Sequence, residues 1–331
     1  MTARKPTVIS AFAGCGGSSL GYRMAGFREL LAIEYDPHAV QVFKANFPDV
    51  PVFDGDIADL SVDECLERTG LDIGVLDVLD GSPPCQGFSI AGRRQADDAR
   101  NDLFLEFVRL LDGLKPKAFV MENVKGLTIG KMRPVFLHIL DTLRKCGYRT
   151  VARILNATHY GVPQNRLRLI VIGVREDIGI EPSHPKPQTR PKSVRDAIGH
   201  LPVGKRGNRS QCLLKAWEQL LPGQAMRKAF PGVGQMQSYR IDPAKPSPAQ
   251  IKSSRNFHWR VCRNLSIPEE SILQGFPESF VWVGPKTKCH ERIGNSVPPP
   301  MMAAIASQIR TSVLTAYHSI QKTKAEKQGK Q

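Results

Sequence analysis

Strand-like runs and helical patterns alternate along the first 185 residues of this chain, and this alternation constrains the fold more than any other feature. Each strand-like run is followed within two residues by a glycine or an acidic residue. Alternation of this kind predicts an α/β domain with a doubly wound, Rossmann-like sheet. The strand-like runs cover residues 8–12, 29–33, 52–53, 75–79 and 118–121, and the helical patterns cover residues 102–114 and 134–146.

The first strand-like run leads into a glycine turn, Ala-Gly-Cys-Gly-Gly-Ser-Ser-Leu-Gly at residues 13–21, and then into a helical pattern. Glycines allow a ligand to approach the backbone, and a helix N-terminus offers N–H groups to an anion. On its own the turn is equally expected for steric reasons. Glu34 and Asp56 follow the next two runs, where carboxylates can accept hydrogen bonds from ribose hydroxyls and an adenine amino group. No Gly-x-x-x-x-Gly-Lys-Ser/Thr element occurs, so a nucleoside without a triphosphate fits best.

A cysteine follows the fourth run, in the sequence Gly-Ser-Pro-Pro-Cys-Gln-Gly-Phe-Ser at residues 81–89. The two prolines stiffen this loop and Gly87 permits a tight turn, so Cys85 is expected in a fixed loop at the ligand edge of the sheet. This placement suggests a nucleophile. A buried structural thiol is the commoner role of a lone cysteine, and only the rest of the pattern decides between the two.

The order of these elements resembles that of the DNA cytosine-5 methyltransferase family, of the prokaryotic restriction-modification type. Four later blocks strengthen the resemblance, which covers about residues 8–309 except the centre. Ser10 stands where many members carry Asp, and Pro268-Glu269 replaces a frequent Arg-Glu; both concern local packing or phosphate contacts. The four blocks are Phe-Val-Met-Glu-Asn-Val (residues 119–124), Gln-Asn-Arg-Leu-Arg (164–168), Leu-Gln-Gly-Phe-Pro (273–277) and Gly-Asn-Ser-Val-Pro-Pro (294–299).

The resemblance implies covalent catalysis by four residues. A Cys85 thiolate would add to carbon 6 of cytosine, so that carbon 5 becomes enamine-like and accepts a methyl group. Glu122 would bind N3 and the amino group of the ring, in a protonated or proton-sharing form. Arg168 would hold O2 and lower the pKa of the thiol, with Arg166 supporting the site. The competing interpretations are an ordinary surface glutamate and a basic surface strand that presents both arginines on one face.

The resemblance further implies that S-adenosylmethionine is the cofactor. Its binding residues would come from the glycine turn, from the strand ends that follow it and from the last block. They are Phe12, Gly14, Cys15, Gly17, Glu34, Tyr35, Asp56, Ile57, Pro83, Leu103, Asn295 and Val297.

The resemblance implies double-stranded DNA as the partner, and the charge of the chain agrees with it. The formal net charge is +15, and residues 186–263 contain 16 Lys and Arg against three Asp and Glu, so this window alone carries +13. A solvated basic surface is the plainer interpretation, but aromatic residues interleave with these charges. A target cytosine in a duplex must also be flipped into the catalytic pocket. The residues expected to contact DNA are Ser89, Lys205, Arg206, Arg209 and Arg240.

Four segments are expected. Residues 1–185 would form the cofactor-binding catalytic domain, and residues 186–289 a smaller basic target-recognition domain after a proline-rich linker. Residues 290–315 would form a return segment whose helix, over residues 301–314, packs on the first domain, and residues 316–331 would be a disordered polar tail. Residues 201–250 are expected to select the DNA sequence.

Other features limit the class of protein. Seven cysteines without a Cys-x-x-Cys pair argue against both a disulfide framework and a metal site. No membrane span or secretory signal is recognisable, so a cytoplasmic, monomeric enzyme is expected, with a cognate restriction endonuclease acting separately. Two alternatives remain. The tRNA-methylating branch usually carries a Cys-Phe-Thr tripeptide that is absent here, and a non-catalytic DNA-binding relative would lack Cys85 or Glu122.

Overall fold

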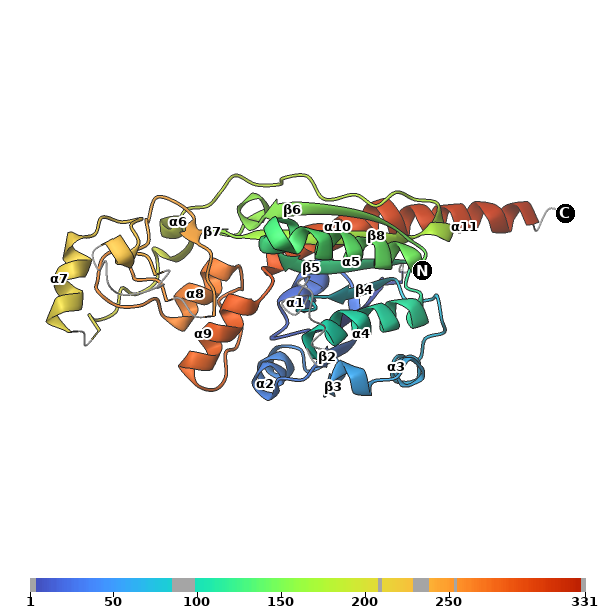
Figure 1. The fold of residues 1–331 in the computed structure, drawn as a ribbon, viewed down its shortest axis with the longest axis horizontal. Helices are drawn as coiled ribbons and strands as arrows, with labels where there is room; N and C mark the ends of the chain where they lie inside the picture. The colour runs from blue at the N-terminus through green and yellow to red at the C-terminus, as the bar shows by residue number, and fades with distance from the viewer. Residues whose placement is uncertain (1–3, 85–98, 208–209, 229–237, 253–254, 329–331) are drawn as a thin grey trace. The chain divides into compact units, whose positions relative to one another are not determined.

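The chain forms two compact units, each built from segments that are not continuous in sequence (Figure 1). Unit 1 consists of residues 1–155, 167–186 and 302–331, and unit 2 consists of residues 156–166 and 187–301. The two units divide between residues 186 and 187, and residues 156–166 and 290–301 group with unit 2. The computed structural model describes residues 4–84, 99–207, 210–228, 238–252 and 255–328.

Unit 1 is built on a seven-stranded sheet with the order β3-β2-β1-β4-β5-β8-β6. The first five strands in this order pair in parallel, and β8 pairs antiparallel to β5. The mixed α/β fold with a mostly parallel sheet is therefore confirmed. The direction of winding reverses between β1 and β4, and ligands bind at such a reversal beyond the carboxyl ends of the strands. The strands are β1 (Thr7–Ala11), β2 (Arg28–Glu34), β3 (Val52–Asp54), β4 (Val78–Gly81), β5 (Ala118–Val124), β6 (Tyr148–Asn156) and β8 (Leu167–Arg175).

Helices connect the parallel strands, as short crossovers in such a sheet require. The two helices predicted after the fourth and fifth strands are α4 and α5. The helices are α1 (Gly17–Met24), α2 (Pro37–Asn46), α3 (Val62–Thr69), α4 (Ala99–Leu114), α5 (Arg133–Lys145), α10 (Pro299–Ile309) and α11 (Thr315–Gln328), with short 3-10 turns η1 (Ile57–Asp59), η2 (Lys125–Thr128), η3 (Gly130–Met132) and η5 (Glu176–Ile178).

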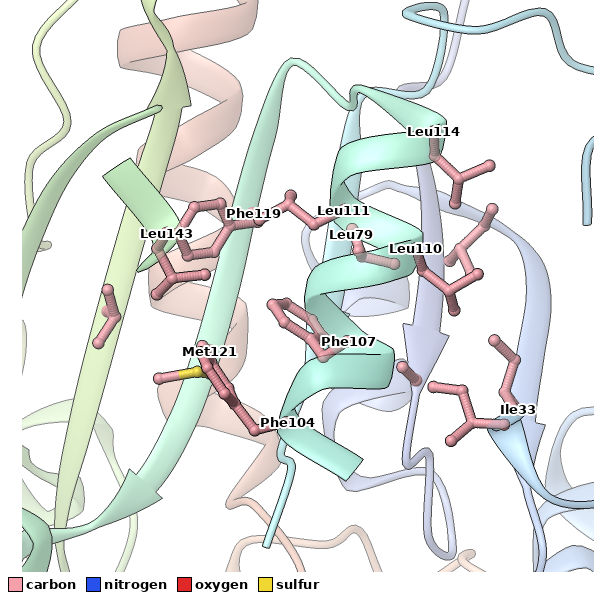
Figure 2. Packing of buried hydrophobic residues seen from close by; sticks show 14 of the residues in the cluster. Ile33, Leu79, Phe104, Phe107, Leu110, Leu111, Leu114, Phe119, Met121 and Leu143 are labelled. Carbon is pink, nitrogen blue, oxygen red and sulfur yellow. The ribbon is translucent and has the colours of Figure 1, made fainter. Parts of the chain in front are cut away.

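The core of unit 1 lies between the sheet and α3, α4 and α5. Figure 2 shows α4 laying Phe107 against the strands, close to Leu79 of β4 and Phe119 of β5. The rings of Phe107 and Phe119 meet edge to face at 6.1 Å. A Cβ atom at Gly81 would lie 2.7 Å from the Phe107 ring, so glycine lets α4 approach the end of β4. Each such buried phenylalanine contributes about 1.5–3 kcal/mol.

The last segment of unit 1 differs from its prediction. A helix is expected over residues 301–314 and a disordered tail after it. Instead, α10 is followed by a π-helical turn (Arg310–Leu314) and by α11, which continues through Gln328. The tail prediction is wrong in this respect because Ala, Glu, Lys and Gln, which make the segment polar, are also good helix formers.

Unit 2 has little regular structure and two small apolar cores. One core surrounds Trp259 and Leu273, and the other surrounds Leu214 and Phe257. Two short strands pair in parallel. In the described part of the chain no helix is long and apolar enough to cross a membrane. The elements of unit 2 are η4 (Ala157–Tyr160), β7 (Gln164–Asn165), α6 (Val194–Ile198), α7 (Gln211–Gln219), η6 (Met226–Lys228), β9 (Ser247–Pro248), α8 (Ile267–Gln274) and α9 (Lys286–Asn295).

Candidate active site

The glycine turn between β1 and α1 is fixed by Glu34 at the end of β2. The main-chain N–H of Gly14 donates to Oε2 of Glu34 and that of Asp36 donates to Oε1, both at 2.8 Å. Gly16 begins α1 at φ 90° with no side-chain cap, and a Cβ atom there would lie 2.3 Å from the ring of Phe47. Phe12 has φ 57°, which is uncommon outside glycine and occurs mainly where function holds the backbone.

Acidic and aromatic side chains follow β2 and β3 at the same edge of the sheet. Tyr35 is 69% exposed, which is unusual for a large aromatic residue. Asp36 caps α2 by accepting from the N–H groups of His38 and Ala39. Asp56 is exposed and caps η1 by accepting from the N–H of Ala58. The predicted carboxylates therefore stand at successive strand ends.

The other predicted cofactor residues of unit 1 are mostly buried around these strand ends. Cys15 and Ile57 are 3% exposed, and Leu103 packs partly buried against the main core. Gly17 is the first residue of α1, and Pro83 is buried after β4. The remaining two, Asn295 and Val297, belong to unit 2, where Asn295 is exposed and Val297 is buried.

Two predicted catalytic residues meet at the ends of β5 and β8. Nε of Arg168 lies 2.7 Å from Oε1 of Glu122, and both side chains are nearly buried. Antiparallel pairing of β5 with β8 aligns Val124 with Arg168, which brings the guanidinium to the glutamate. The adjacent Asn123 donates to the carbonyl oxygen of Pro83 at 3.0 Å, so β5 holds the start of the loop that carries Cys85.

Cys85 itself lies outside the described residues, as do Ser89 and Arg209. Pro83 and Pro84 are described, and they place the beginning of this loop at the carboxyl end of β4. The proximity of Cys85 to Glu122 and Arg168 therefore stays a prediction.

Arg166 has a different role from the one predicted. It is 1% exposed and lies in unit 2, where its guanidinium donates to the carbonyl oxygens of Gln250, Gly294 and Ser296 at 2.6–3.1 Å. A group held in this way positions the backbone and does not face a reacting base. The competing interpretation, a basic surface strand with both arginines on one face, is wrong as well, because Arg166 is buried and β8 begins only at Leu167.

Buried amides extend this network through the family blocks. Nε2 of Gln164 donates to Oε1 of Gln274 at 2.9 Å, and Nε2 of Gln274 donates to the carbonyl oxygen of Ser296. The N–H of Gln250 donates back to Oε1 of Gln164. Since buried polar groups must be paired, these residues close unit 2 around segments that are far apart in sequence.

A buried acidic pair was not anticipated from the sequence. Burial, together with the nearby Glu29 carboxylate, raises the pKa of Asp80 at the end of β4 to about 8, against a hydrogen bond from Ser18 that lowers it. Burial likewise raises the pKa of Glu29 in β2 to about 7, against a hydrogen bond from Ser19 that lowers it. Tyr22 of α1 donates to Oδ1 of Asp80 at 3.3 Å. The pair therefore lies under the helix that follows the glycine turn.

The predicted DNA-contacting residues that are described fall into two groups. Lys205 and Arg206 are exposed, and neither forms an ion pair within the described residues. Arg240 instead stacks on the Trp217 ring at 3.8 Å and donates to the carbonyl oxygens of Trp217, Leu220 and Trp259. Its donors hold main-chain oxygens of unit 2, and its contact with DNA stays a prediction.

In the described residues no group of three or more His, Cys, Asp or Glu side chains could hold a metal ion.

Sequence comparisons identify relatives over nearly the whole chain. A family model described as C-5 cytosine-specific DNA methylase matches residues 6–311. Type II methyltransferase M1.HphI of Haemophilus parahaemolyticus is 38% identical over 326 residues, which cover 92% of this chain and 86% of the relative. Type II methyltransferase M.XorII of Xanthomonas oryzae pv. oryzae is 33% identical over 361 residues, which cover 92% and 84%.

Solved structures share the fold. A prophage-encoded E. coli protein assigned as a DNA modification methyltransferase aligns with a TM-score of 0.81 and 26% identity, over 94% of this chain and 100% of its own. The S. pombe Dnmt2 methyltransferase aligns with a TM-score of 0.66 over 92% of this chain and 98% of its own. At 19% identity, the second match bears on the fold alone.

Proposed function

On the premise that this chain belongs to the C-5 cytosine-specific DNA methylase family and is a DNA cytosine-5 methyltransferase, we propose that it methylates a cytosine flipped out of a specific double-stranded sequence. S-adenosylmethionine would supply the methyl group, and the transfer would pass through a covalent adduct of Cys85. The observation that carries this proposal is the ion pair of Glu122 with Arg168, next to the Asn123 bond that holds the Cys85 loop.

The chemistry requires a nucleophile, because carbon 5 of cytosine does not attack a methyl donor unaided. The Cys85 thiolate forms a bond to carbon 6, and the electron pair of the 5,6 double bond becomes available at carbon 5. Carbon 5, now nucleophilic, would take up the electrophilic methyl group of bound S-adenosylmethionine, whose sulfur would leave as a neutral thioether. A base then removes the proton from carbon 5, the double bond reforms and the thiolate leaves.

Glu122 and Arg168 act on the ring during this addition. Glu122 shares a proton with N3 and accepts a hydrogen bond from the exocyclic amino group, which offsets the charge that builds up in the ring. Arg168 contacts O2 and provides positive charge that favours the thiolate form of Cys85. Their ion pair supports these roles, because each side chain holds the other at the strand ends.

The residues around the glycine turn fit S-adenosylmethionine. Glu34 offers a fixed carboxylate for the ribose hydroxyls, and the exposed Tyr35 ring offers a flat apolar surface for adenine. Asp56 offers an exposed carboxylate for the adenine amino group. When bound, the sulfonium supplies an electrophilic methyl group, and the turn contributes close backbone approach.

Unit 2 would bind and select the DNA. The window of residues 186–263 carries net charge +13, and Lys205 and Arg206 are exposed there without carboxylate partners among the described residues. Residues 201–250 would read the site. The chain would work as a monomer, and the description of its relatives as Type II methyltransferases supports a modification enzyme that acts beside a restriction endonuclease of the same specificity.

The first experiment finds the substrate. The chain is expressed in a host without cytosine methylation, and methylated positions are mapped by bisulfite sequencing of DNA and tRNA. Methylation of one short DNA sequence is expected. Methylation of tRNA, or of neither nucleic acid, would contradict the proposal.

The second experiment tests the adduct. In a duplex of the mapped site, 5-fluorocytosine replaces the target base, because fluorine at carbon 5 cannot leave as a proton and the enzyme stays attached. The parent chain and a Cys212→Ser control should form a complex that survives denaturing electrophoresis, while Cys85→Ser should form none and should retain cofactor binding. An adduct with Cys85→Ser would refute the assignment of the nucleophile.

A further inference from the structure

A strongly basic segment follows Glu122 directly. We define it as the basic loop, residues 124–133, which covers the end of β5, η2, η3 and the first residue of α5. Lys125, Lys131 and Arg133 are exposed in it, and the sequence contains no acidic residue between Asn123 and Leu140. None of the three cations forms an ion pair within the described residues.

The positive charges of the basic loop are electrostatically unfavourable for α5, the helix that begins at its last residue. The N-terminus of α5 carries the positive end of the helix dipole, yet Met132 provides no side-chain cap and the first turn contains no acidic residue. Two other helices follow the usual rule, since Ser61 caps α3 with two acidic residues in the first turn and Ser266 does the same for α8, whereas α1 and α9 also begin without a side-chain cap or an acidic first turn. A local arrangement that repels itself is expected where a ligand of opposite charge binds.

Apolar side chains lie among these charges. Val124 is 49% exposed and Ile129 is 57% exposed. Apolar side chains would add no affinity for a small free anion. A DNA strand, in contrast, presents phosphates that alternate with apolar sugar faces. The surface therefore fits an extended polyanion.

The position of the basic loop is fixed by the topology of unit 1. It leaves the carboxyl end of β5, the edge at which Glu122 and Arg168 meet, and Lys125 is three residues from Glu122. Asn123 joins this strand end to the start of the Cys85 loop. A nucleotide in the catalytic site would bring its own flanking phosphates to this edge.

We propose that the basic loop of unit 1 is a second DNA-binding surface, which holds the phosphates flanking the target cytosine through Lys125, Lys131, Arg133 and the α5 N-terminus. The inference rests on the proposed function, since it names where the DNA lies on the catalytic unit. It assigns phosphate contacts to residues outside the basic window of unit 2.

The test compares two triple variants with equal loss of charge. The first is Lys125→Gln/Lys131→Gln/Arg133→Gln. The control is Arg4→Gln/Lys5→Gln/Arg28→Gln, whose residues are exposed at the amino ends of β1 and β2, the opposite edge of the sheet. Fluorescence anisotropy measures the affinity for a duplex containing the mapped site, as a function of salt concentration.

Each lost phosphate contact should reduce the steepness of the plot of log K against log salt by about 0.9. Over the tenfold range from 1 M to 0.1 M salt, this loss lowers the gain in DNA affinity by about eightfold. The basic-loop variant should therefore bind about 100-fold or more weakly at 0.1 M salt, with a higher KM for DNA and unchanged cofactor affinity. The control variant should match the parent. The unfolding temperature of the basic-loop variant should equal or exceed that of the parent, because repulsion at α5 is relieved.

Three outcomes would overturn the inference. If the parent methylates DNA but the two variants share its salt slope, the basic loop does not contact phosphates, and the proposed function stands. If the basic-loop variant unfolds at a lower temperature, its cations have structural partners. If the parent neither binds nor methylates DNA, the proposed function fails and this inference fails with it.

Discussion

Replacing Asp80 with asparagine should stabilise unit 1, and the gain should grow with pH. Asp80 is 2% exposed, and burial raises the pKa of its carboxyl to about 8 from an ordinary 3.8. In the unfolded chain the carboxyl ionises above about pH 4, whereas the folded chain must keep it protonated. Folding therefore carries a proton-uptake cost that begins near pH 4 and is complete near pH 8. Asparagine has no such cost, and its Oδ1 can still accept the Tyr22 hydroxyl.

The size of the effect follows from the two pKa values. At pH 7 the carboxyl is about three pH units above its ordinary pKa, and each unit corresponds to about 1.4 kcal/mol, so Asp80→Asn should gain up to about 4 kcal/mol. Near pH 4 the gain should vanish. Asp141→Asn is the control, because Lys145 lowers the pKa of the exposed Asp141 and its substitution should give no gain.

Urea unfolding at pH 4.5, 6, 7 and 8 measures these differences. Circular dichroism follows both units, and tryptophan fluorescence reports unit 2 alone, since Trp217, Trp259 and Trp282 all lie there. The gain should appear in the dichroism transition only. An Asp80→Asn difference that is constant over this pH range would refute the reasoning, because it would show that proton uptake by Asp80 is not the cost.

Three further substitutions test the site and its support. Glu34→Ala should weaken S-adenosylmethionine binding by about 1–3 kcal/mol in calorimetry, because it removes a predicted ligand and releases Gly14, while the exposed Glu67→Ala should not; equal affinities would contradict the site. Arg166→Lys should destabilise unit 2 by about 2–4 kcal/mol in the fluorescence transition, since one ammonium cannot serve three carbonyl oxygens, whereas Arg206→Lys should be neutral. Gly294→Ala should cost about 1–3 kcal/mol, because its Cβ would lie 2.7 Å from the backbone at residues 251–252, and an unchanged midpoint would argue against this packing.

The sequence predicts the parallel part of the sheet well because each strand there is a short apolar run with a polar end. The same logic places Glu34, Asp56 and Glu122 at strand ends, and the structure has them there. Parallel strands connected by helices bring their carboxyl ends to one edge, so strand order is not needed to predict that these side chains share it.

The predictions from sequence miss a contact where a residue's partner lies far away in the sequence. Arg166 and Arg168 are two positions apart, but the chain changes its pairing partner between them, and alternation cannot detect that change. Arg240 is one arginine among many in a basic window, and only the folded chain brings it onto Trp217. Asp80 and Glu29 both lie under α1, where Tyr22 and Ser19 contact them, and neither apolar run shows on which face of the sheet its acidic residue lies.

The division of unit 1 into three segments sets an order for its assembly during translation. Residues 1–155 and 167–186 supply the whole sheet, but the buried helix α10 and the bond from Arg310 to the carbonyl oxygen of Ala25 come from residues synthesised after all of unit 2. The nascent sheet therefore leaves the ribosome with apolar surface uncovered while unit 2 is still being made. Chaperones that bind exposed apolar surface should engage this chain within that interval, and a slower passage through the codons of unit 2 should lengthen it.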